Sequence, residues 1–317
     1  MTTTDDPFVF LAPGHSVDRA CSIYMRRWSL ITRLALIEVI PQIMLTLSLK
    51  KTLVLATSQW IVPNMNDIWN SMSTMRIVLL SIEYALCCLS GIIVQAAIIQ
   101  VVIEYYANKY SSFKASLRLA FDRFGAILCF KLLYVTALLI VSIAVGGSLY
   151  YLLLLHNFAR VDGLAFVALL IILTASAIVA YVILSLAVGL PIIMVEKRSS
   201  IGALKRSFEL VSGYRCYIFC SICLMSLLVG IGVVIYRIMV GFMFGFSFFG
   251  AVFYALSALV TLPLQTILTN ILYFSLRVRK EGLNGETLAG EMEENNRGIG
   301  NYNNVSIEEA DCEAPYL

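Results

Sequence analysis

The sequence predicts an all-α, polytopic membrane protein with six transmembrane helices. Hydrophobic residues make up 60% of the 317 residues and charged residues only 14%, whereas a soluble domain has about 25% charged residues. Several apolar runs exceed the roughly 20 residues that a helix needs to cross a bilayer. The basic residues fall in alternate loops, which is the third sign of a chain that crosses a membrane repeatedly.

Six apolar segments are long enough to span. They run approximately over 30–49, 77–106, 124–155, 163–195, 216–236 and 248–276. We therefore expect a cytosolic N-terminal segment (1–28), a membrane domain (29–276) and a cytosolic tail (277–317). Residues 281–317 contain nine acids and one base, so we expect this tail to be disordered and to bind protein partners.

The distribution of Lys and Arg predicts the orientation. With six spans, sixteen of the 23 basic residues lie on one side: in the N-terminal segment, in the loops after spans two and four, and in the tail. Cytosolic loops carry the excess of basic residues, so both termini are predicted to be cytosolic. An odd number of spans would destroy this asymmetry.

Two of the basic loops resemble each other. KYSSFKASLRLAFDRFG (109–125) aligns with KRSSIGALKRSFELVSG (197–213) at an offset of 88 residues, and SVDRACSIYMRRW (16–28) is a degraded third copy. In the first two copies a serine pair can cap the helix, apolar residues recur at steps of three and four, and the bases lie mainly on other faces. We expect short cytosolic amphipathic helices before spans three and five, and a weaker one before span one.

The bases of these segments have two interpretations. They can act only as a topology signal, or they can also contact anionic lipid headgroups or a docking partner, since basic helices beside a span lie in the headgroup plane. A catalytic role is disfavoured because neither copy contains histidine, paired carboxylates or a Gly-rich phosphate loop. The candidate headgroup or topology residues are Lys109, Lys114, Arg118, Lys197, Arg198, Lys205, Arg206, Arg277, Arg279 and Lys280.

Two motifs carry a family resemblance. LPIIMVEKRSSIGALKRSFELVSG (190–213) resembles the exit of the fourth span in a broad group of six-span proteins, which includes the membrane domain of some glycerophosphodiester phosphodiesterases. The matching positions are Pro191, Glu196, Ala203, Arg206, Ser207, Leu210 and Gly213. ILYFSLRVRKEGLNGETL (271–288) is similar to the end of that family's sixth span, at Tyr273, Leu276, Arg277, Arg279, Lys280, Glu281 and Gly282.

The resemblance covers roughly residues 16–290. In the fused members hydrolysis belongs to a separate soluble barrel. This chain has no His-Arg-Gly opening and no carboxylate set for that chemistry. The resemblance therefore implies a six-span fold and a membrane role without hydrolysis.

Ionisable residues inside the apolar segments are the other candidate site. Glu38, Glu83 and Lys131 lie within spans, and intramembrane charges are costly and often mark transport routes. Glu38 and Lys131 are at similar depth from the basic side, so we expect them to form an ion pair if spans one and three are adjacent. A structural tie between helices and a substrate or proton path both stay open.

The sequence favours a non-enzymatic multi-pass protein with a lipid-associated or scaffolding role. The alternative is a transporter of small solutes or lipids that uses Glu38, Glu83 and Lys131. We predict no catalytic residues, cofactor, metal or nucleic-acid partner. Cys216, Cys220 and Cys223 share a helical face, but a zinc site needs a fourth ligand and the two histidines are remote. The expected partners are lipids of an anionic leaflet and proteins that contact the tail.

Overall fold

The computed structural model describes residues 11–57, 74–107, 112–159, 164–244 and 248–284, together with 287 and 290. Within these residues the chain forms helices and no strands, which confirms the all-α class. The helices are α1 (Pro13–Arg26), α2 (Trp28–Thr57), α4 (Thr74–Tyr106), α5 (Phe113–Asp122), α6 (Phe124–Ala159), α7 (Leu164–Leu186), α8 (Gly189–Val195), α9 (Ser200–Val211), α10 (Arg215–Phe244), α11 (Phe248–Leu256) and α12 (Ala258–Glu281).

Six stretches of these helices are long and apolar enough to cross a membrane. They are Trp28–Ser48, Ile77–Tyr106, Phe124–Ser148, Phe166–Val195, Arg215–Phe244 and Val252–Glu281. The six-span, multi-pass architecture predicted from the sequence is therefore confirmed. The fourth stretch combines α7 and α8, and Pro191 lies in the first turn of α8, where a missing backbone N–H costs no helical hydrogen bond.

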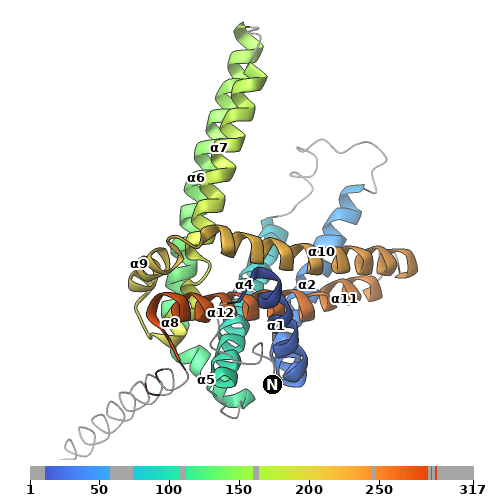
Figure 1. Ribbon diagram of the computed structural model, residues 1–317. Coiled ribbons are helices and arrows are strands. Elements are labelled where there is room, and N and C mark those ends of the chain that lie inside the picture. Colours follow the sequence, from blue (N-terminus) through green and yellow to red (C-terminus); the bar gives the residue numbers. More distant parts are fainter. Residues whose placement is uncertain are drawn as a thin grey trace, which may run out of the picture.

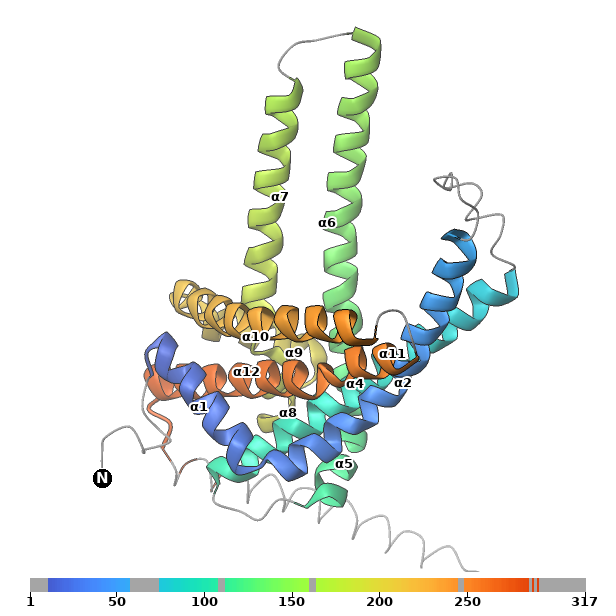
Figure 2. The same cartoon turned by 90° about the vertical axis from the view of Figure 1, so that its right-hand side faces the viewer.

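The apolar helices form three hairpins. α2 packs against α4, α6 against α7, and α10 against α11 and α12. Figures 1 and 2 show that the α6–α7 hairpin projects away from the other helices, and that α10 and α12 run crosswise to it. Spans seldom tilt by more than about 40° from the membrane normal. The α6–α7 and α10–α12 hairpins do not share one direction in this structure.

The hairpins meet in one buried region, which we call the hub. Most of its buried residues come from the C-terminal ends of the even-numbered spans, over 94–106 in α4, 188–195 around α8, and 264–276 in α12. The outer parts of α6 and α7 are different, because their large apolar side chains, such as Ile143 (64% exposed) and Leu173 (54% exposed), face outward. Contiguous exposed apolar surface of this kind is typical of contact with lipid.

Each of the three short helices α1, α5 and α9 packs on one of these hub ends. α5 lies against α4, α9 against α8, and α1 against α12 at the other end of the chain. Each helix buries two small residues, four and eight positions after its N-cap. The pairs are Ser16 and Ala20, Ser116 and Ala120, and Ala203 and Ser207, all with 0% exposure.

The helix starts give the register between α5 and α9. The N-caps are Ser112 and Ser199, so equivalent helix positions are 199 − 112 = 87 residues apart, one fewer than the sequence alignment gives. Only Ser199 caps with its side chain, accepting a hydrogen bond from the Gly202 N–H at 3.3 Å. The small-residue pairs therefore correspond in helix position even where the aligned letters differ.

We expect Ala120→Val to lower the free energy of unfolding by about 1 kcal/mol or more, because added methyl groups have no room at a fully buried position. Ala115→Val, on the exposed side of α5, is the matched control and shares the lower helix propensity of valine. Denaturant titration of the two purified variants in detergent measures the difference. Equal stabilities would contradict close packing of α5 on α4.

Candidate functional sites

A ring of polar side chains joins the α8–α9 corner to the end of α12. Glu196, at the C-terminal end of α8, accepts hydrogen bonds from the Nε of Arg206 (3.3 Å) and from the hydroxyl of Tyr273 (3.2 Å). Arg277 donates from Nη1 to the same hydroxyl (3.2 Å) and from Nε to Glu281 (2.9 Å). Arg206 also donates to Glu281. These five residues therefore close a ring, which we call the polar ring.

The polar ring is buried at Tyr273 and Arg277 and partly exposed at Arg206 and Glu281, whose side chains are 21% and 27% exposed. Tyr273 is 0% and Arg277 6% exposed. Burial lowers the pKa of Arg206, whereas the carboxylates of Glu196 and Glu281 raise it, and its pKa lies above the ordinary value. Every charge of the ring therefore has an opposite charge beside it. Such an arrangement ties α8, α9 and α12 together.

A second contact attaches the other end of α9 to α12. Lys280 donates from Nζ to the backbone carbonyls of Glu209 (2.6 Å) and Ser212 (2.7 Å). These carbonyls lie at the C-terminal end of α9, where a cation satisfies groups that have no partner inside the helix. One residue beyond α12, Gly282 has φ +66, the left-handed conformation that ends helices.

The structure divides the ten candidate headgroup residues. Arg206, Arg277 and Lys280 contact groups within the protein, as described above. Arg198 donates to Glu196 at 2.9 Å, and Lys197 is half-buried with a pKa lowered by burial and by the neighbouring Arg123. Six of the ten are exposed to solvent: Lys114, Arg118, Arg198, Lys205, Arg279 and Lys280. Lys109 lies outside the described residues.

The intramembrane candidates lie in separate places. Glu38 is 7% exposed and faces Gly91 of α4, where an added Cβ would come within 3.3 Å of its Oε1. Glu83 accepts a hydrogen bond from the Ser48 hydroxyl at 2.8 Å. Lys131 lines a cavity of the hub. Neither Glu38 nor Glu83 lines that cavity.

The predicted ion pair between Glu38 and Lys131 is wrong. Both side chains belong to the described residues, and among these no ion pair joins them. The reason is the packing of the spans: α2 packs against α4, α11 and α12, whereas α6 packs against α4, α7, α8 and α9. Equal depth from one surface does not bring two residues together when their helices face different neighbours.

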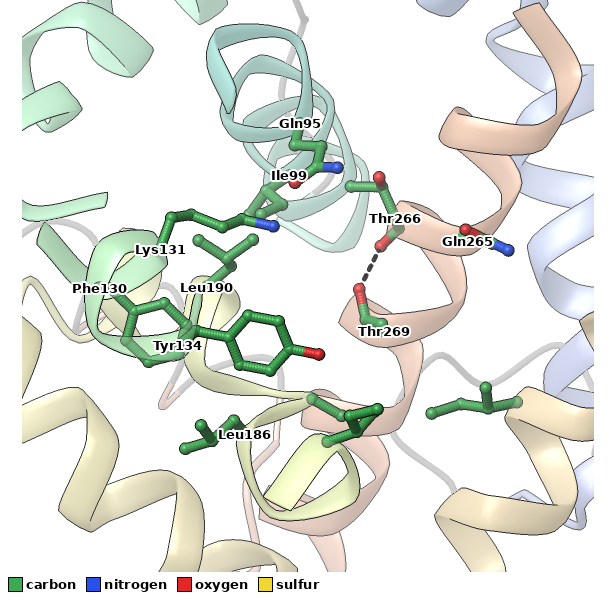
Figure 3. Close-up of a pocket in the computed structure, with 13 residues that line it drawn as sticks. Gln95, Ile99, Phe130, Lys131, Tyr134, Leu186, Leu190, Gln265, Thr266 and Thr269 are labelled. Atoms are coloured by element: carbon green, nitrogen blue, oxygen red, sulfur yellow. Dashed lines mark hydrogen bonds between the residues drawn. The ribbon is translucent and has the colours of Figure 1, made fainter. Parts of the chain in front are cut away.

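The cavity beside Lys131 has a volume of about 300 Å³ and is bounded by six helices and the turn between α7 and α8. Figure 3 shows its lining, which comprises Gln95, Ile99, Phe130, Lys131, Tyr134, Ile183, Leu186, Ala187, Leu190, Ile222, Gln265, Thr266 and Thr269. The ammonium of Lys131 points into the cavity toward α12, and the hydroxyl of Tyr134 and the amide of Gln95 extend toward the same space. Gln265 points away.

The sequence patterns identified part of these sites. The sequence identifies Lys131 as an intramembrane charge but does not single out Tyr134, although its spacing of three residues from Lys131 places both on one face of α6. Tyr273 and Glu281 stand out in the sequence only as motif positions, and nothing local indicates that they contact Glu196 and Arg206. No group of three or more potential metal ligands occurs among the described residues.

No protein-family model, curated protein or solved structure matches this chain.

Proposed function

We propose that this multi-pass membrane protein is not an enzyme and that it associates with anionic lipids at the cytosolic face of its membrane. The observation that carries the proposal is the outward face of α5 and α9. α5 exposes Lys114, Arg118 and Phe121, and α9 exposes Ile201 and Lys205, with Phe121 55% and Ile201 73% exposed.

This combination is typical of helices that lie at a membrane surface. Large apolar side chains insert beside the headgroups while neighbouring bases contact the lipid phosphates. The inner faces of both helices are occupied by the hub, so the bases lie on the faces left for lipid. The predicted cytosolic side supports the same assignment, because the cytosolic leaflet is rich in anionic lipids.

The family resemblance also supports a membrane role without hydrolysis. The motif residues Glu196, Arg206, Tyr273, Arg277 and Glu281 belong to the polar ring, where they hold helices together. The transporter alternative that uses Glu38, Glu83 and Lys131 has weaker support, because Glu38 and Glu83 do not line the cavity that contains Lys131.

The test is selective retention of lipid. The protein is reconstituted in vesicles of phosphatidylcholine and phosphatidylserine, extracted in mild detergent, and its retained lipids are quantified by mass spectrometry. We expect the triple variant Lys114→Gln, Arg118→Gln, Lys205→Gln to retain less phosphatidylserine relative to phosphatidylcholine than the wild type, since each base near an anionic leaflet contributes about 1 kcal/mol, roughly fivefold in affinity.

The control keeps the charges. Lys114→Arg with Lys205→Arg is expected to retain phosphatidylserine as the wild type does. If the triple variant retains the two lipids in the wild-type ratio, the exposed bases serve topology alone and the proposal fails.

A further inference from the structure

The cavity of the hub is lined by one cationic side chain, Lys131, and by the hydrogen-bonding side chains of Tyr134 and Gln95. Lys131 lies seven residues after Phe124, where α6 begins, a depth of about 10 Å along the helix. Among the described residues, no ion pair or hydrogen bond joins its ammonium, the hydroxyl of Tyr134 or the amide of Gln95 to another protein group. A cation in a span is costly without an opposite charge beside it.

From this geometry we propose that the cavity binds the compact anionic headgroup of a lipid, a phosphate or a carboxylate, with its acyl chains left in the bilayer. The donors fit such a group: an ammonium, a phenolic hydroxyl and a primary amide converge on one space (Figure 3) and can all donate to anionic oxygens. Their bonds to the headgroup also satisfy polar groups that would otherwise lie in the membrane unpaired.

The threonines of α12 limit the chemistry further. Thr266 donates its hydroxyl proton to the carbonyl of Leu262 at 2.8 Å, and Thr269 donates to the carbonyl of Thr266 at 2.8 Å. Their oxygens can therefore only accept hydrogen bonds, so the anionic oxygens lie toward Lys131 and any hydroxyl of the ligand lies toward α12.

The size of the cavity favours a headgroup over a whole lipid. About 300 Å³ is at the lower limit of ordinary ligand pockets, which run from about 300 to 1,000 Å³. The surrounding helices expose apolar side chains such as Leu132 and Leu133, against which acyl chains can lie. This site is separate from the exposed bases of α5 and α9, and the inference does not depend on them.

The test uses the full chain, delipidated in non-ionic detergent, with three probes followed by native mass spectrometry. The probes are dioctanoyl phosphatidic acid, dioctanoyl phosphatidylcholine and inorganic phosphate. We expect saturable binding of the phosphatidic acid, and a loss of about tenfold or more in Lys131→Met, which removes a charge-assisted hydrogen bond. Lys131→Arg keeps the charge and is expected to bind more tightly than Lys131→Met.

Two further variants serve as a second probe of the cavity and as a control outside it. Tyr134→Phe removes one oxygen without a change in volume and is expected to weaken binding several-fold even if Lys131→Met fails to fold. Lys205→Met, on the surface of α9, removes a base outside the cavity and is expected to bind as the wild type does. The surface triple variant should likewise keep this site, so the two proposals can fail separately.

Three outcomes would overturn the inference. Equal binding of phosphatidic acid by the wild type, Lys131→Met and Tyr134→Phe would show that the cavity is not the site. Equal binding of phosphatidylcholine would show that the headgroup charge is not recognised, and equal binding of inorganic phosphate would show that the ligand is a soluble anion and not a lipid.

Discussion

Replacement of Arg277 by alanine is expected to lower the free energy of unfolding by about 2–3 kcal/mol, because it removes a buried guanidinium and its hydrogen bonds to Tyr273 and Glu281. Arg277 is 6% exposed, and its guanidinium joins Tyr273 to Glu281 in the polar ring. Alanine breaks both bonds and leaves a cavity where the side chain packed. The carboxylate of Glu281 then has only Arg206 to balance it.

The matched control lies two residues further along α12. Arg279 is exposed, and Arg279→Ala is expected to change the free energy of unfolding by about 0.5 kcal/mol or less. Arg277→Lys keeps the charge but lacks the planar fork that contacts two partners, so we expect an intermediate loss. Denaturant titration in detergent measures all three, and similar values for Arg277→Ala and Arg279→Ala would show that the ring contributes little.

The polar ring also predicts which helix should open locally when Arg277 is replaced. Arg206 connects the middle of α9 to α12 through the ring, and Lys280 holds the C-terminal end of α9. Loss of Arg277 weakens the first of these attachments. Faster hydrogen exchange in α9 than in the outer part of α6 would therefore indicate local opening at the ring.

The fold class is predictable from the sequence because the bilayer determines it. A run of about 20 apolar residues has few alternatives to a spanning helix, and each of the six predicted segments corresponds to one. The charge asymmetry adds an orientation, which stays a prediction, as do the internal repeat and the family resemblance.

The length of the apolar runs and the charge asymmetry do not predict how the helices pack against one another. Hydropathy gives the depth of Glu38 and Lys131 but not the direction in which each side chain points, and for this reason the predicted ion pair is wrong. The polar ring is a contact that the sequence does not predict. Glu196 and Arg277 are 81 positions apart in sequence, and only the folded chain brings both to Tyr273.

The cavity of the hub could be predicted from the sequence only in part. Lys131 and Tyr134 share a face of α6, and this much is visible in their spacing. Gln95 comes from α4 and Thr269 from α12, and their approach to Lys131 depends on how the three hairpins meet. Contacts between distant segments decide this, and one sequence shows no pattern for them.

The second large effect is expected at Gly189, where two physical effects oppose each other. The residue begins α8, and it is not among the described glycines with positive φ, which are Gly213 and Gly282. Its backbone is therefore compatible with alanine, which on its own would stabilise the protein by about 0.4–1 kcal/mol through the unfolded state. A Cβ at this position, however, would overlap the ring of Phe130 from α6.

We expect the destabilising overlap to exceed the stabilising effect of alanine, because the aromatic ring of Phe130 cannot move away easily. Phe130 is 3% exposed and belongs to the buried core, so its displacement forces neighbouring side chains out of their preferred conformations. We expect Gly189→Ala to lower the free energy of unfolding by about 3 kcal/mol, at the upper end of the cost of overpacking. Gly230→Ala in α10, where a Cβ would meet nothing within 4 Å, is the control and should be neutral or stabilising.

Whether the overlap with Phe130 causes the destabilisation can be tested by removing the aromatic ring of Phe130. Phe130→Leu alone should destabilise the protein, because it leaves space in the hub. Combined with Gly189→Ala, however, it removes the atoms with which the new methyl group overlaps, so the double variant should be more stable than the sum of the two single effects predicts. Additive effects in this double-mutant cycle would show that α8 does not pack directly on α6. The contact between these two hairpin ends, which closes the hub beside the cavity, would then have to be sought elsewhere.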